Sequence, residues 1–563
     1  MASGTFEAQG VRVAIEGCGH GTLNAIYAAV ETSCEARGWD DGVDLLIIGG
    51  DFQATRNAAD LTIMSVPPKY RQLGDFHEYY SGARRAPCLT IFVAGNHEAA
   101  GYLWELYYGG WVAPNIYYMG AANVLRLGPL RIAGMSGIWK GFDYRKPHHE
   151  RLPFSRDDVK SFYHVREIDA RKLLQIRTQV DVGISHDWPR GVEKHGDQRR
   201  LFRMKPDFEE ESRDGTLGNM AAEYVMDRLR PPYWFSAHLH CKFAAIKTYQ
   251  PPGGSRGDSP LEIAASAQDA ASVEATTITH EAQGANPDEI DLDMDDDDGA
   301  EDSKPVPASS EATEQSKQPK SAAPSSVSDA LRAQLPASFT QPKRPKPATT
   351  PGQPVPPTIT NTTVRFLALD KCLPGRKFLQ VCDVLPHDSS SLASHPSSNA
   401  SLPRYKLQYD PEWLAITRAF APFLTIGDRT AHTPPDLGEE AYRALIDAER
   451  VWVDEHVVAN GRLDVPENFT VTAPPHVPGM PESTSEQPNE YTNPQTAAFC
   501  ELVGVQNLWA ASEEERAERK RKGPPPEQHG PGGGFRGGGR GRGRGGNRGR
   551  GRGRGYGGRG RDR

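Results

Sequence analysis

The segment VRVAIEGCGHGTLNAIYAAVETSCEARGWDDGVDLLIIGGDF (residues 11–52) contains two apolar runs separated by a helix-like stretch. Each apolar run is short and ends in glycine, which is typical of a buried strand followed by a turn. The stretch between the two runs, residues 23–37, is amphipathic at the spacing of an α-helix. A strand, a helix and a second strand in this order predict a layered α/β fold.

Further apolar runs continue this alternation to about residue 249. They are LTIFVAG (residues 89–95), LRIAGMSG (residues 130–137), VDVGISH (residues 180–186) and YWFSAH (residues 233–238). Helix-like stretches separate several of these runs. We therefore expect one α/β domain over residues 1–249.

The rest of the chain divides by composition. Residues 250–361 are rich in Pro, Ser, Ala, Gln and Asp without apolar periodicity, which predicts a disordered acidic linker. Apolar patterns return in VRFLALDKCLPGRKFLQVCDV (residues 364–384) and YDPEWLAITRAF (residues 409–420). We expect residues 362–510 to form a small C-terminal extension that packs against the first domain. Residues 511–563 are charged and then turn into Gly-Arg repeats, which predicts a disordered basic tail.

The composition argues against several classes of protein. No apolar run of the 563 residues approaches the roughly 18 that a membrane span needs. The first residues lack a signal-peptide pattern, so we expect a soluble intracellular protein. The seven cysteines are scattered without CxxC pairs, which argues against a disulfide framework or a zinc finger. The formal net charge is −8, but the charges are unevenly distributed. Acidic residues are concentrated near residues 288–302, and arginines are concentrated after residue 516.

Residue types that bind metals follow one apolar run after another. In chain order they are Cys18, His20, Asp51, Asn96, His97, His186, His238 and His240. Strands of an α/β sheet present their carboxyl ends along one edge, so side chains far apart in the chain can meet there. Gly49 and Gly50 permit a tight turn before Asp51. A carboxylate in that position is able to bridge two ions about 3.5 to 4 Å apart.

Each of these signals is weak when taken alone. A single histidine after a strand is more often a hydrogen-bonded structural residue than a ligand, and GNH or HxH occurs by chance. The ordered set C-x-H, GGD, GNHE, SHD and HLH, one at each of five strand ends, is what indicates a two-metal site.

This ordered set resembles the calcineurin-like metallophosphoesterase family over roughly residues 11–242. That family usually begins its first motif with Asp, whereas this chain has Cys18. The cysteine, together with longer stretches, resembles the lariat debranching enzymes in particular. Those stretches are GGDFQATRNAADLTIMSVPPKY, GNHEA, YGGWVAPNIYY, SGIWKGFDYRKPH, SHDWP and YWFSAHLHCKFAA, and then FLALDKCLPGRKFLQV, YDPEWL and NPQTAAFC in the C-terminal extension.

The resemblance implies a ligand set and a reaction. One metal pocket would draw on Cys18, His20, Asp51 and His240, and the other on Asp51, Asn96, His186 and His238. The two divalent ions would be Fe²⁺, Zn²⁺ or Mn²⁺, because a cysteine thiolate favours iron or zinc over magnesium. Hydroxide would attack the 2′,5′-phosphodiester bond at the branch point of an excised intron. His97 would be the general acid or oxyanion partner, with Glu98 orienting its imidazole; a purely structural histidine is the alternative.

A long stretch over about residues 136–166 mixes aromatic and basic residues, which suit single-stranded RNA because rings stack on bases and cations hold phosphates. The resemblance makes it the lariat recognition loop, whereas a mixed surface loop is the alternative from composition alone. The candidate RNA-binding residues are Ser136, Trp139, Lys140, Phe142, Tyr144, Arg145, Lys146, His148, Phe154, Tyr163 and His164.

Three functions remain open at this point. The first is a nuclear enzyme that debranches intron lariat RNA, with spliceosome or RNA-turnover factors as further partners. The second is a calcineurin-like phosphatase or general phosphodiesterase, which leaves the aromatic and basic loop unexplained. The third is a noncatalytic RNA-binding scaffold, which the Gly-Arg tail favours and the intact ligand motifs disfavour. The tail itself is either an RNA contact or a solubilising segment.

Overall fold

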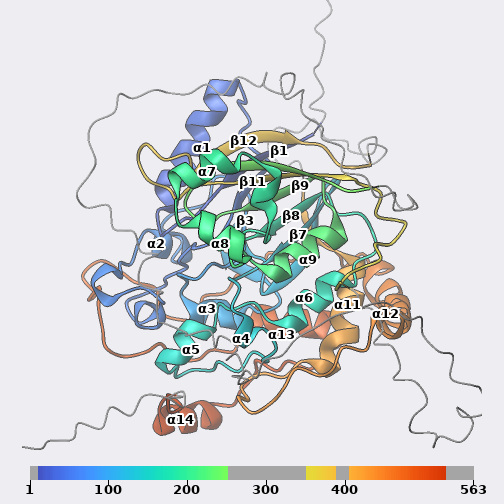
Figure 1. The fold of residues 1–563 in the computed structure, drawn as a ribbon. Helices are drawn as coiled ribbons and strands as arrows, with labels where there is room; N and C mark the ends of the chain where they lie inside the picture. The colour runs from blue at the N-terminus through green and yellow to red at the C-terminus, as the bar shows by residue number, and fades with distance from the viewer. Residues whose placement is uncertain (1–9, 251–349, 389–404, 528–563) are drawn as a thin grey trace, which may run out of the picture. The chain divides into compact units, whose positions relative to one another are not determined.

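The computed structural model describes residues 10–250, 350–388 and 405–527, and they contain two β-sheets that pack face to face (Figure 1). The six-stranded sheet has the order β12 (Leu379–Val384), β1 (Val11–Glu16), β2 (Leu45–Ile48), β3 (Thr90–Phe92), β5 (Ile116–Tyr118) and β4 (Gly110–Ala113). The seven-stranded sheet has the order β10 (Phe243–Thr248), β11 (Thr363–Ala368), β9 (Tyr233–Ser236), β8 (Val182–Ser185), β7 (Leu130–Met135), β6 (Ala122–Leu127) and β13 (Leu407–Tyr409).

Strand β1 illustrates why the apolar runs form strands of this sandwich. Val13 and Ile15 join the apolar cluster between the two sheets, whereas Ala14 joins the cluster on the outer face of the six-stranded sheet. Successive side chains of a strand point to opposite faces, so a strand buried on both faces reads as a continuous apolar run. The layered α/β fold expected from the sequence is confirmed.

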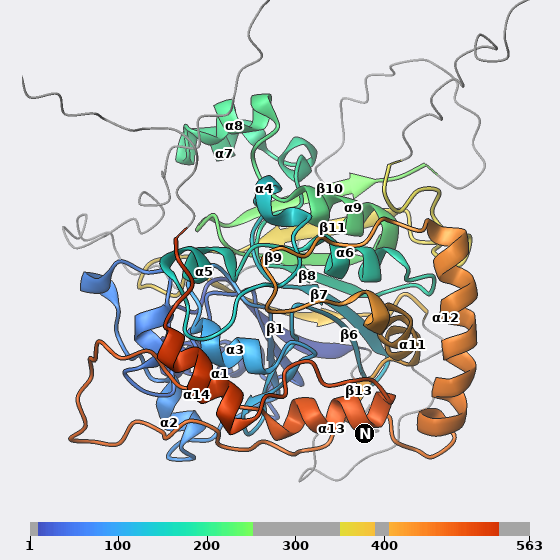
Figure 2. The ribbon, with the colours of Figure 1, turned by 90° about the horizontal axis from the view of Figure 1, so that it is seen from below.

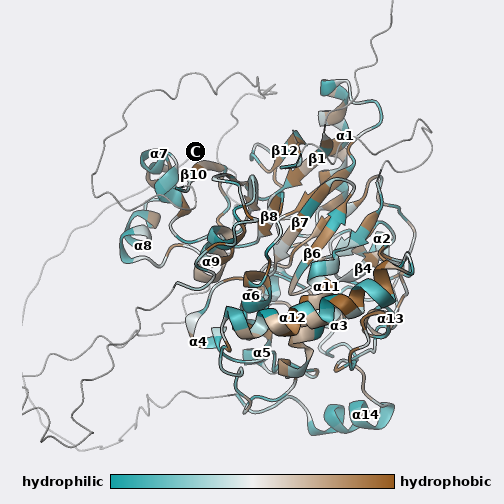
Figure 3. Cartoon of the chain, turned by 90° about the vertical axis from the view of Figure 1, so that its right-hand side faces the viewer, coloured by the Kyte–Doolittle hydropathy of each residue, from teal (hydrophilic) through white to brown (hydrophobic). Residues whose placement is uncertain are grey.

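Helices cover the outer faces of the sheets. Helix α1 (Leu23–Arg37) packs on the six-stranded sheet, and α6 (Glu167–Leu174), α9 (Met220–Leu229) and α11 (Pro411–Phe420) pack on the other. Figure 3 shows apolar strands inside and hydrophilic residues on α7, α8 and α14. The remaining helices are α2 (Phe76–Tyr80), α3 (Ala100–Glu105), α4 (Gly141–Tyr144), α5 (Arg156–Ser161), α7 (Gln198–Met204), α8 (Phe208–Asp214), α12 (Glu439–Val453), α13 (Pro494–Val503) and α14 (Glu513–Lys522).

The C-terminal extension supplies strands to both sheets. Strand β11 lies between β10 and β9, β12 pairs antiparallel with β1, and β13 pairs antiparallel with β6. The two arms that flank Pro374 and Gly375 therefore enter different sheets and do not pair with each other. Figure 2 shows α12 of the extension at the right edge of the molecule and α13 and α14 along its lower edge. The expectation that this extension packs against the first domain is confirmed.

Two boundaries differ from the expectation. Residues 350–361, assigned to the linker, are described and partly packed: Ile359 is buried, and the Asn361 amide donates to the carbonyl of Arg230. The segment after residue 511 begins with helix α14, whose first turn is closed by a capping box between Ser512 and Glu515. The Ser-x-x-Glu pattern that specifies this cap was already visible in the sequence. Residues 251–349 and 528–563, which hold most of the expected linker and tail, lie outside the described residues.

The carboxyl ends of strands from both sheets meet at one end of the sandwich. Strands β1, β2 and β3 are parallel in one sheet, and β8, β9 and β11 are parallel in the other. The predicted metal-binding side chains follow these strands, so they converge from two facing sheets and not along the edge of a single sheet. None of the helices in the described ranges is both long enough and apolar enough for a membrane span.

Candidate metal centre

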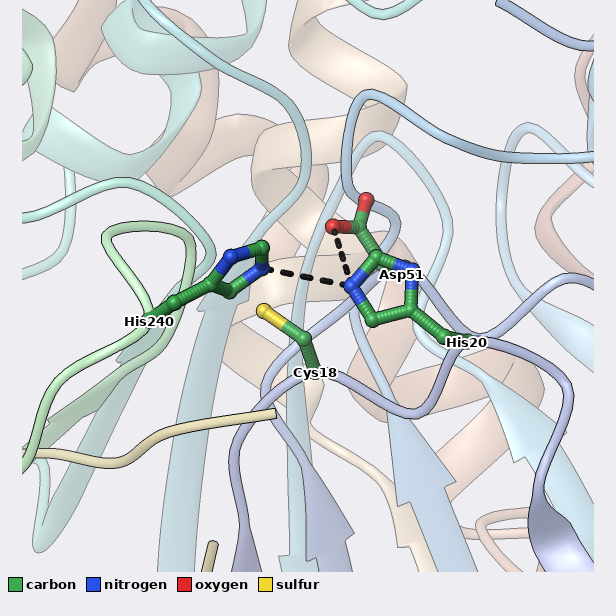
Figure 4. Close-up of side chains that lie close together, drawn as sticks. All are labelled: Cys18, His20, Asp51 and His240. Carbon is green, nitrogen blue, oxygen red and sulfur yellow. Dashed lines mark hydrogen bonds and ion pairs between the residues drawn. The ribbon is translucent and has the colours of Figure 1, made fainter. Parts of the chain in front are cut away.

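Four predicted ligands form one compact group (Figure 4). The donor atoms of Cys18, His20, Asp51 and His240 all lie within 4.8 Å of one another. His20 is central: its Nε2 is 3.2 Å from His240 Nε2 and 3.7 Å from Asp51 Oδ2. Thiolate, imidazole and carboxylate are the donors that transition metals and zinc prefer. The first predicted pocket is therefore assembled by the fold.

The second predicted pocket lies on the other side of Asp51. His186 Nε2 is 3.5 Å from Asp51 Oδ1 and 3.2 Å from Asn96 Oδ1. The rings of His186 and His238 have centroids 5.0 Å apart. The Gly49 carbonyl accepts from His186 Nδ1 at 2.9 Å, so Nε2 carries the lone pair that faces Asp51. All seven predicted ligands are thus brought together, and Asp51 touches both groups.

The backbone around these ligands is strained and tightly packed. Four of these residues have a backbone in the left-handed region, which residues with side chains rarely adopt. Their φ values are 42° for His20, 46° for Asp51, 60° for His238 and 46° for His240. Such conformations cluster at functional sites. A Cβ at Gly95 would lie 2.1 Å from Asp51 Oδ1, so only glycine allows the main chain to approach the carboxylate there.

Burial and charge set the protonation of the pocket. Burial lowers the pKa of His20 to about 3 and also lowers the pKa of His186. Burial by itself would raise the pKa of Asp51, but the neighbouring imidazoles of His186, His97 and His20 outweigh it and hold that pKa far below its usual value. At neutral pH the pocket therefore presents neutral imidazoles at His20 and His186 and an ionised carboxylate at Asp51, the forms that bind metal.

His97 is held beside the ligands but belongs to neither group. Its Nδ1 donates to the Ser65 carbonyl at 2.8 Å, its Nε2 is 3.0 Å from the Asn96 amide nitrogen, and its backbone N–H donates to Asp51 Oδ1 at 2.9 Å. The centroids of the His97 and His20 rings are 5.8 Å apart. Ser65 therefore fixes the tautomer of His97 and leaves Nε2 for the site. No sequence pattern pointed to Ser65, because a backbone carbonyl acts here and any residue type supplies one.

Glu98 does not orient His97 as expected. Its carboxylate accepts hydrogen bonds from the backbone N–H groups of Phe52 at 2.8 Å, Gln53 at 2.8 Å and Gly95 at 3.0 Å. Burial, with the nearby charge of Asp51, raises the pKa of Glu98 to about 7. Glu98 thus ties the turn that follows β2 to the turn that follows β3, which positions Asp51 relative to Asn96.

The residues of the expected recognition loop fall into three groups by exposure. The side chains of Phe142, Arg145 and Lys146 are exposed around α4. Half-buried positions are Ser136, Trp139, Lys140, Tyr144 and His148. Phe154, Tyr163 and His164 are buried, so in this structure they support the loop and present no free face to RNA. The sequence pattern missed this difference because burial depends on contacts with distant segments.

Several contacts connect this loop to the predicted metal ligands. The Tyr163 hydroxyl is 3.1 Å from the Ser65 hydroxyl, and the Ser65 carbonyl holds His97. The Trp139 N–H donates to the carboxylate of Asp187 at 3.2 Å, directly after His186 in the chain. The Ser136 hydroxyl accepts from the N–H of Ala94 and donates to the Gly120 carbonyl, a structural role at the base of the loop. The loop is therefore fixed beside the site.

Comparisons with known proteins agree with this geometry. Residues 11–242 match the family of calcineurin-like phosphoesterases, and residues 361–508 match the C-terminal domain of lariat debranching enzymes. The lariat debranching enzyme of Schizosaccharomyces pombe is 38% identical over 501 residues, covering 88% of this chain and 96% of that protein. The human enzyme of the same name is 35% identical over 508 residues, covering 90% and 72%. The enzyme from Arabidopsis thaliana is 33% identical over 504 residues, covering 89% and 88%. The chain, with its phosphoesterase sandwich, its cysteine-containing ligand set and its matching C-terminal extension, belongs to the lariat debranching enzyme family.

Proposed function

We propose that this chain hydrolyses the 2′,5′-phosphodiester bond at the branch point of intron lariat RNA. The main observation behind this proposal is that seven predicted ligand side chains converge beside a loop. The exposed tip of that loop holds Phe142, Arg145 and Lys146. Membership of a family whose curated members are named lariat debranching enzymes supports the same substrate.

The donor set fits two divalent metal ions that share Asp51. Asp51 Oδ2 is buried and accepts no hydrogen bond from any described residue, so it has capacity for a ligand. Cys18, His20 and His240 complete the first pocket, and Asn96, His186 and His238 complete the second. Ions held there would supply positive charge at the phosphate and lower the pKa of a water nucleophile. We propose Fe²⁺ or Zn²⁺, with Mn²⁺ as a substitute, because the Cys18 sulfur is a soft donor.

His97 completes the chemistry on the leaving side. Its Nδ1–H is held by the Ser65 carbonyl, so the proton that it would donate is the second one, carried on Nε2 by the imidazolium form. Cleavage breaks the bond between phosphorus and the 2′ oxygen of the branch nucleotide. The 2′ oxygen takes a proton to become a hydroxyl, and the phosphate stays on the former 5′ end of the intron.

The exposed tip of the loop suits splayed bases and their phosphates. The Phe142 ring is 65% exposed and stands 5.7 Å, centroid to centroid, from the ring of His164. Aromatic rings stack on unpaired bases, and arginine or lysine binds phosphate. We infer that the substrate enters across α4.

We also infer that the reaction takes place in the nucleus. Spliceosome or RNA-turnover factors would supply and consume the RNA there. The Gly-Arg tail, which lies outside the described residues, is proposed as a second RNA contact.

A branched oligonucleotide tests this function. A synthetic RNA with one 2′,5′ branch and a linear RNA of the same sequence are incubated with metal-replete protein, and the products are resolved by gel. Release of the branch strand with the linear control intact supports debranching. Equal cleavage of both RNAs supports a general phosphodiesterase instead, and no cleavage of either with retained binding supports a scaffold.

A further inference from the structure

Lys371 belongs to the C-terminal extension but lies beside the ligand Cys18. It follows β11, in the segment that runs past the turn after β1. The Cys18 N–H donates to the Asp370 carbonyl at 3.4 Å, and the Cys372 N–H donates to the Cys18 carbonyl at 3.2 Å. Cys18 and Lys371 themselves form an isolated parallel bridge. Figure 4 shows a yellow segment of the extension that runs close to Cys18.

The bridge determines the direction of the Lys371 side chain. Residues paired across neighbouring strands project their side chains to the same face. The Cys18 sulfur is one of the four donors of the first pocket, so Lys371 leaves the backbone on the side of that pocket.

No carboxylate of a described residue forms a close ion pair with this ammonium. Lys371 is 8% exposed, and within the described ranges no carboxylate lies within 4.0 Å of its Nζ. Asp370, the adjacent acid, instead accepts the Lys371 backbone N–H at 2.8 Å, and its Oδ2 is 3.6 Å from the Arg376 guanidinium. Burial raises the pKa of Asp370, and the charges of Lys371 and Lys205 act against this, so Asp370 shares its charge among several cations at longer range. A buried ammonium usually has a partner, and here an anion at the metal centre would provide one.

We propose that Lys371 is a substrate-binding residue whose ammonium contacts a nonbridging oxygen of the phosphodiester at the metal centre. This inference rests on the proposed function, and it makes the C-terminal extension a part of the active site. A phosphodiester carries one negative charge, and hydrolysis concentrates charge on its nonbridging oxygens. A fixed cation in a water-poor pocket stabilises that charge more than it would in water.

The test compares two readouts across matched variants. Lys371→Met removes the charge and keeps the length, Lys371→Gln is a second charge-removing variant in case the first fails to fold, and Lys371→Arg keeps the charge. Lys406→Met is the control, because Lys406 lies in the same extension with its side chain 78% exposed and paired with Asp464. Binding of inorganic phosphate to the metal-loaded protein is measured by calorimetry. Cleavage is measured on branched RNA and on bis(4-nitrophenyl) phosphate, a generic phosphodiester.

We expect Lys371→Met or Lys371→Gln to weaken phosphate binding and slow cleavage of both substrates, each by about 10- to 100-fold, with unchanged metal content. Lys371→Arg should retain most of both, and Lys406→Met should match the parent. Parent-like phosphate binding in a folded charge-removing variant would overturn the proposal, as would equal losses in the Arg and Met variants. If the parent protein cleaves the generic diester but not branched RNA, the proposed function fails, while phosphate binding still decides the role of Lys371.

Discussion

At the residue scale, Asp51 is the side chain that lies between the two groups of predicted metal ligands. It lies 3.7 Å from His20 Nε2 through one oxygen and 3.5 Å from His186 Nε2 through the other. Left-handed backbone at Asp51 and at three histidine ligands costs of order 1–3 kcal/mol each. Glycines at positions 50 and 95 and the carboxylate of Glu98 hold these conformations in place. The fold therefore tolerates local backbone strain at the positions that orient the predicted ligands.

His97→Ala should separate binding from chemistry. The imidazole is not in either ligand group, so metal content and affinity for branched RNA should remain near the parent values. Single-turnover cleavage should fall by about 10²-fold or more, because the departing 2′ oxygen loses its proton donor. His456→Ala is the control, since that ring is exposed and stacked on Trp452. A parent-like single-turnover rate in His97→Ala would remove this residue from the mechanism.

The sequence predicts which side chains meet at the candidate site, but it does not predict the residues that support them. Cys18, Asp51 and His186 each follow an apolar run. This local pattern is visible in the sequence without knowledge of the fold. Ser65 acts through a backbone carbonyl, which leaves no trace in the residue type. Lys371 also follows an apolar run, but its nearness to Cys18 depends on β11 joining the seven-stranded sheet from far along the chain.

At the element scale, the predicted recognition loop combines an exposed tip with a buried base. The tip is α4, and below it His164 Nδ1 is 2.6 Å from the Asp143 carboxylate. Further along, the Arg151 guanidinium contacts Glu490 at 3.2 Å, and the Phe154 N–H donates to Gln487 at 2.7 Å. The C-terminal extension therefore braces the loop, which predicts that RNA meets a formed surface. The aromatic and basic pattern does not distinguish the exposed tip from the buried base, because burial depends on the contacts of the fold.

The double variant Phe142→Ala/Arg145→Ala should weaken branched-RNA binding by about 10- to 100-fold, because it removes a stacking ring and a phosphate contact. Hydrolysis of bis(4-nitrophenyl) phosphate should stay near the parent rate, since the metal ligands are untouched. Binding is measured by fluorescence anisotropy, with Arg443→Ala on α12 as the control for a lost surface arginine. An unchanged RNA affinity would mean that the substrate does not cross α4.

Asp410 anchors another element, helix α11. Its carboxylate caps the helix through the Trp413 N–H at 3.0 Å and contacts Arg131 at 2.7 Å and Arg126 at 2.8 Å, while fully buried. Asp410→Asn should lower the free energy of unfolding by about 1.5–3 kcal/mol, because buried Arg131 would lose its charged hydrogen bonds to Asp410 and keep Glu412, at 2.7 Å, as its carboxylate partner. Chemical denaturation measures this loss. A change within about 0.5 kcal/mol, the range usual for surface substitutions, would contradict the assigned role.

At the scale of the whole molecule, the two matched segments form one sandwich and cannot act as separate domains. Strand β11 pairs with both β9 and β10, so removing it would expose two strand edges inside the seven-stranded sheet. The chain on either side of residues 251–349 contacts one residue, since the Tyr249 hydroxyl donates to the Asp227 carboxylate at 2.8 Å and the Gln353 amide donates to the Asp227 carbonyl at 3.5 Å. The linker expected from composition thus interrupts the chain between two paired strands.

Replacing residues 251–349 with a short Gly/Ser linker should preserve folding and cleavage of a short branched RNA, because every proposed ligand and Lys371 lie outside that segment. A chain that ends at residue 250 should instead be insoluble or unfolded. Circular dichroism and cleavage of a branched oligonucleotide measure both outcomes. A folded and active protein ending at residue 250 would contradict the shared sandwich.

The most direct measurement of the central claim is the single-turnover rate of metal-replete Asp51→Ala on a branched oligonucleotide, beside the parent protein and the linear control. The account predicts that the parent cuts only the 2′,5′ junction, and that Asp51→Ala, folded as judged by circular dichroism, loses at least about 10³-fold in rate because both metal pockets lose a ligand. Near-parent turnover in folded Asp51→Ala protein would contradict the shared-carboxylate site on which the proposed hydrolysis depends.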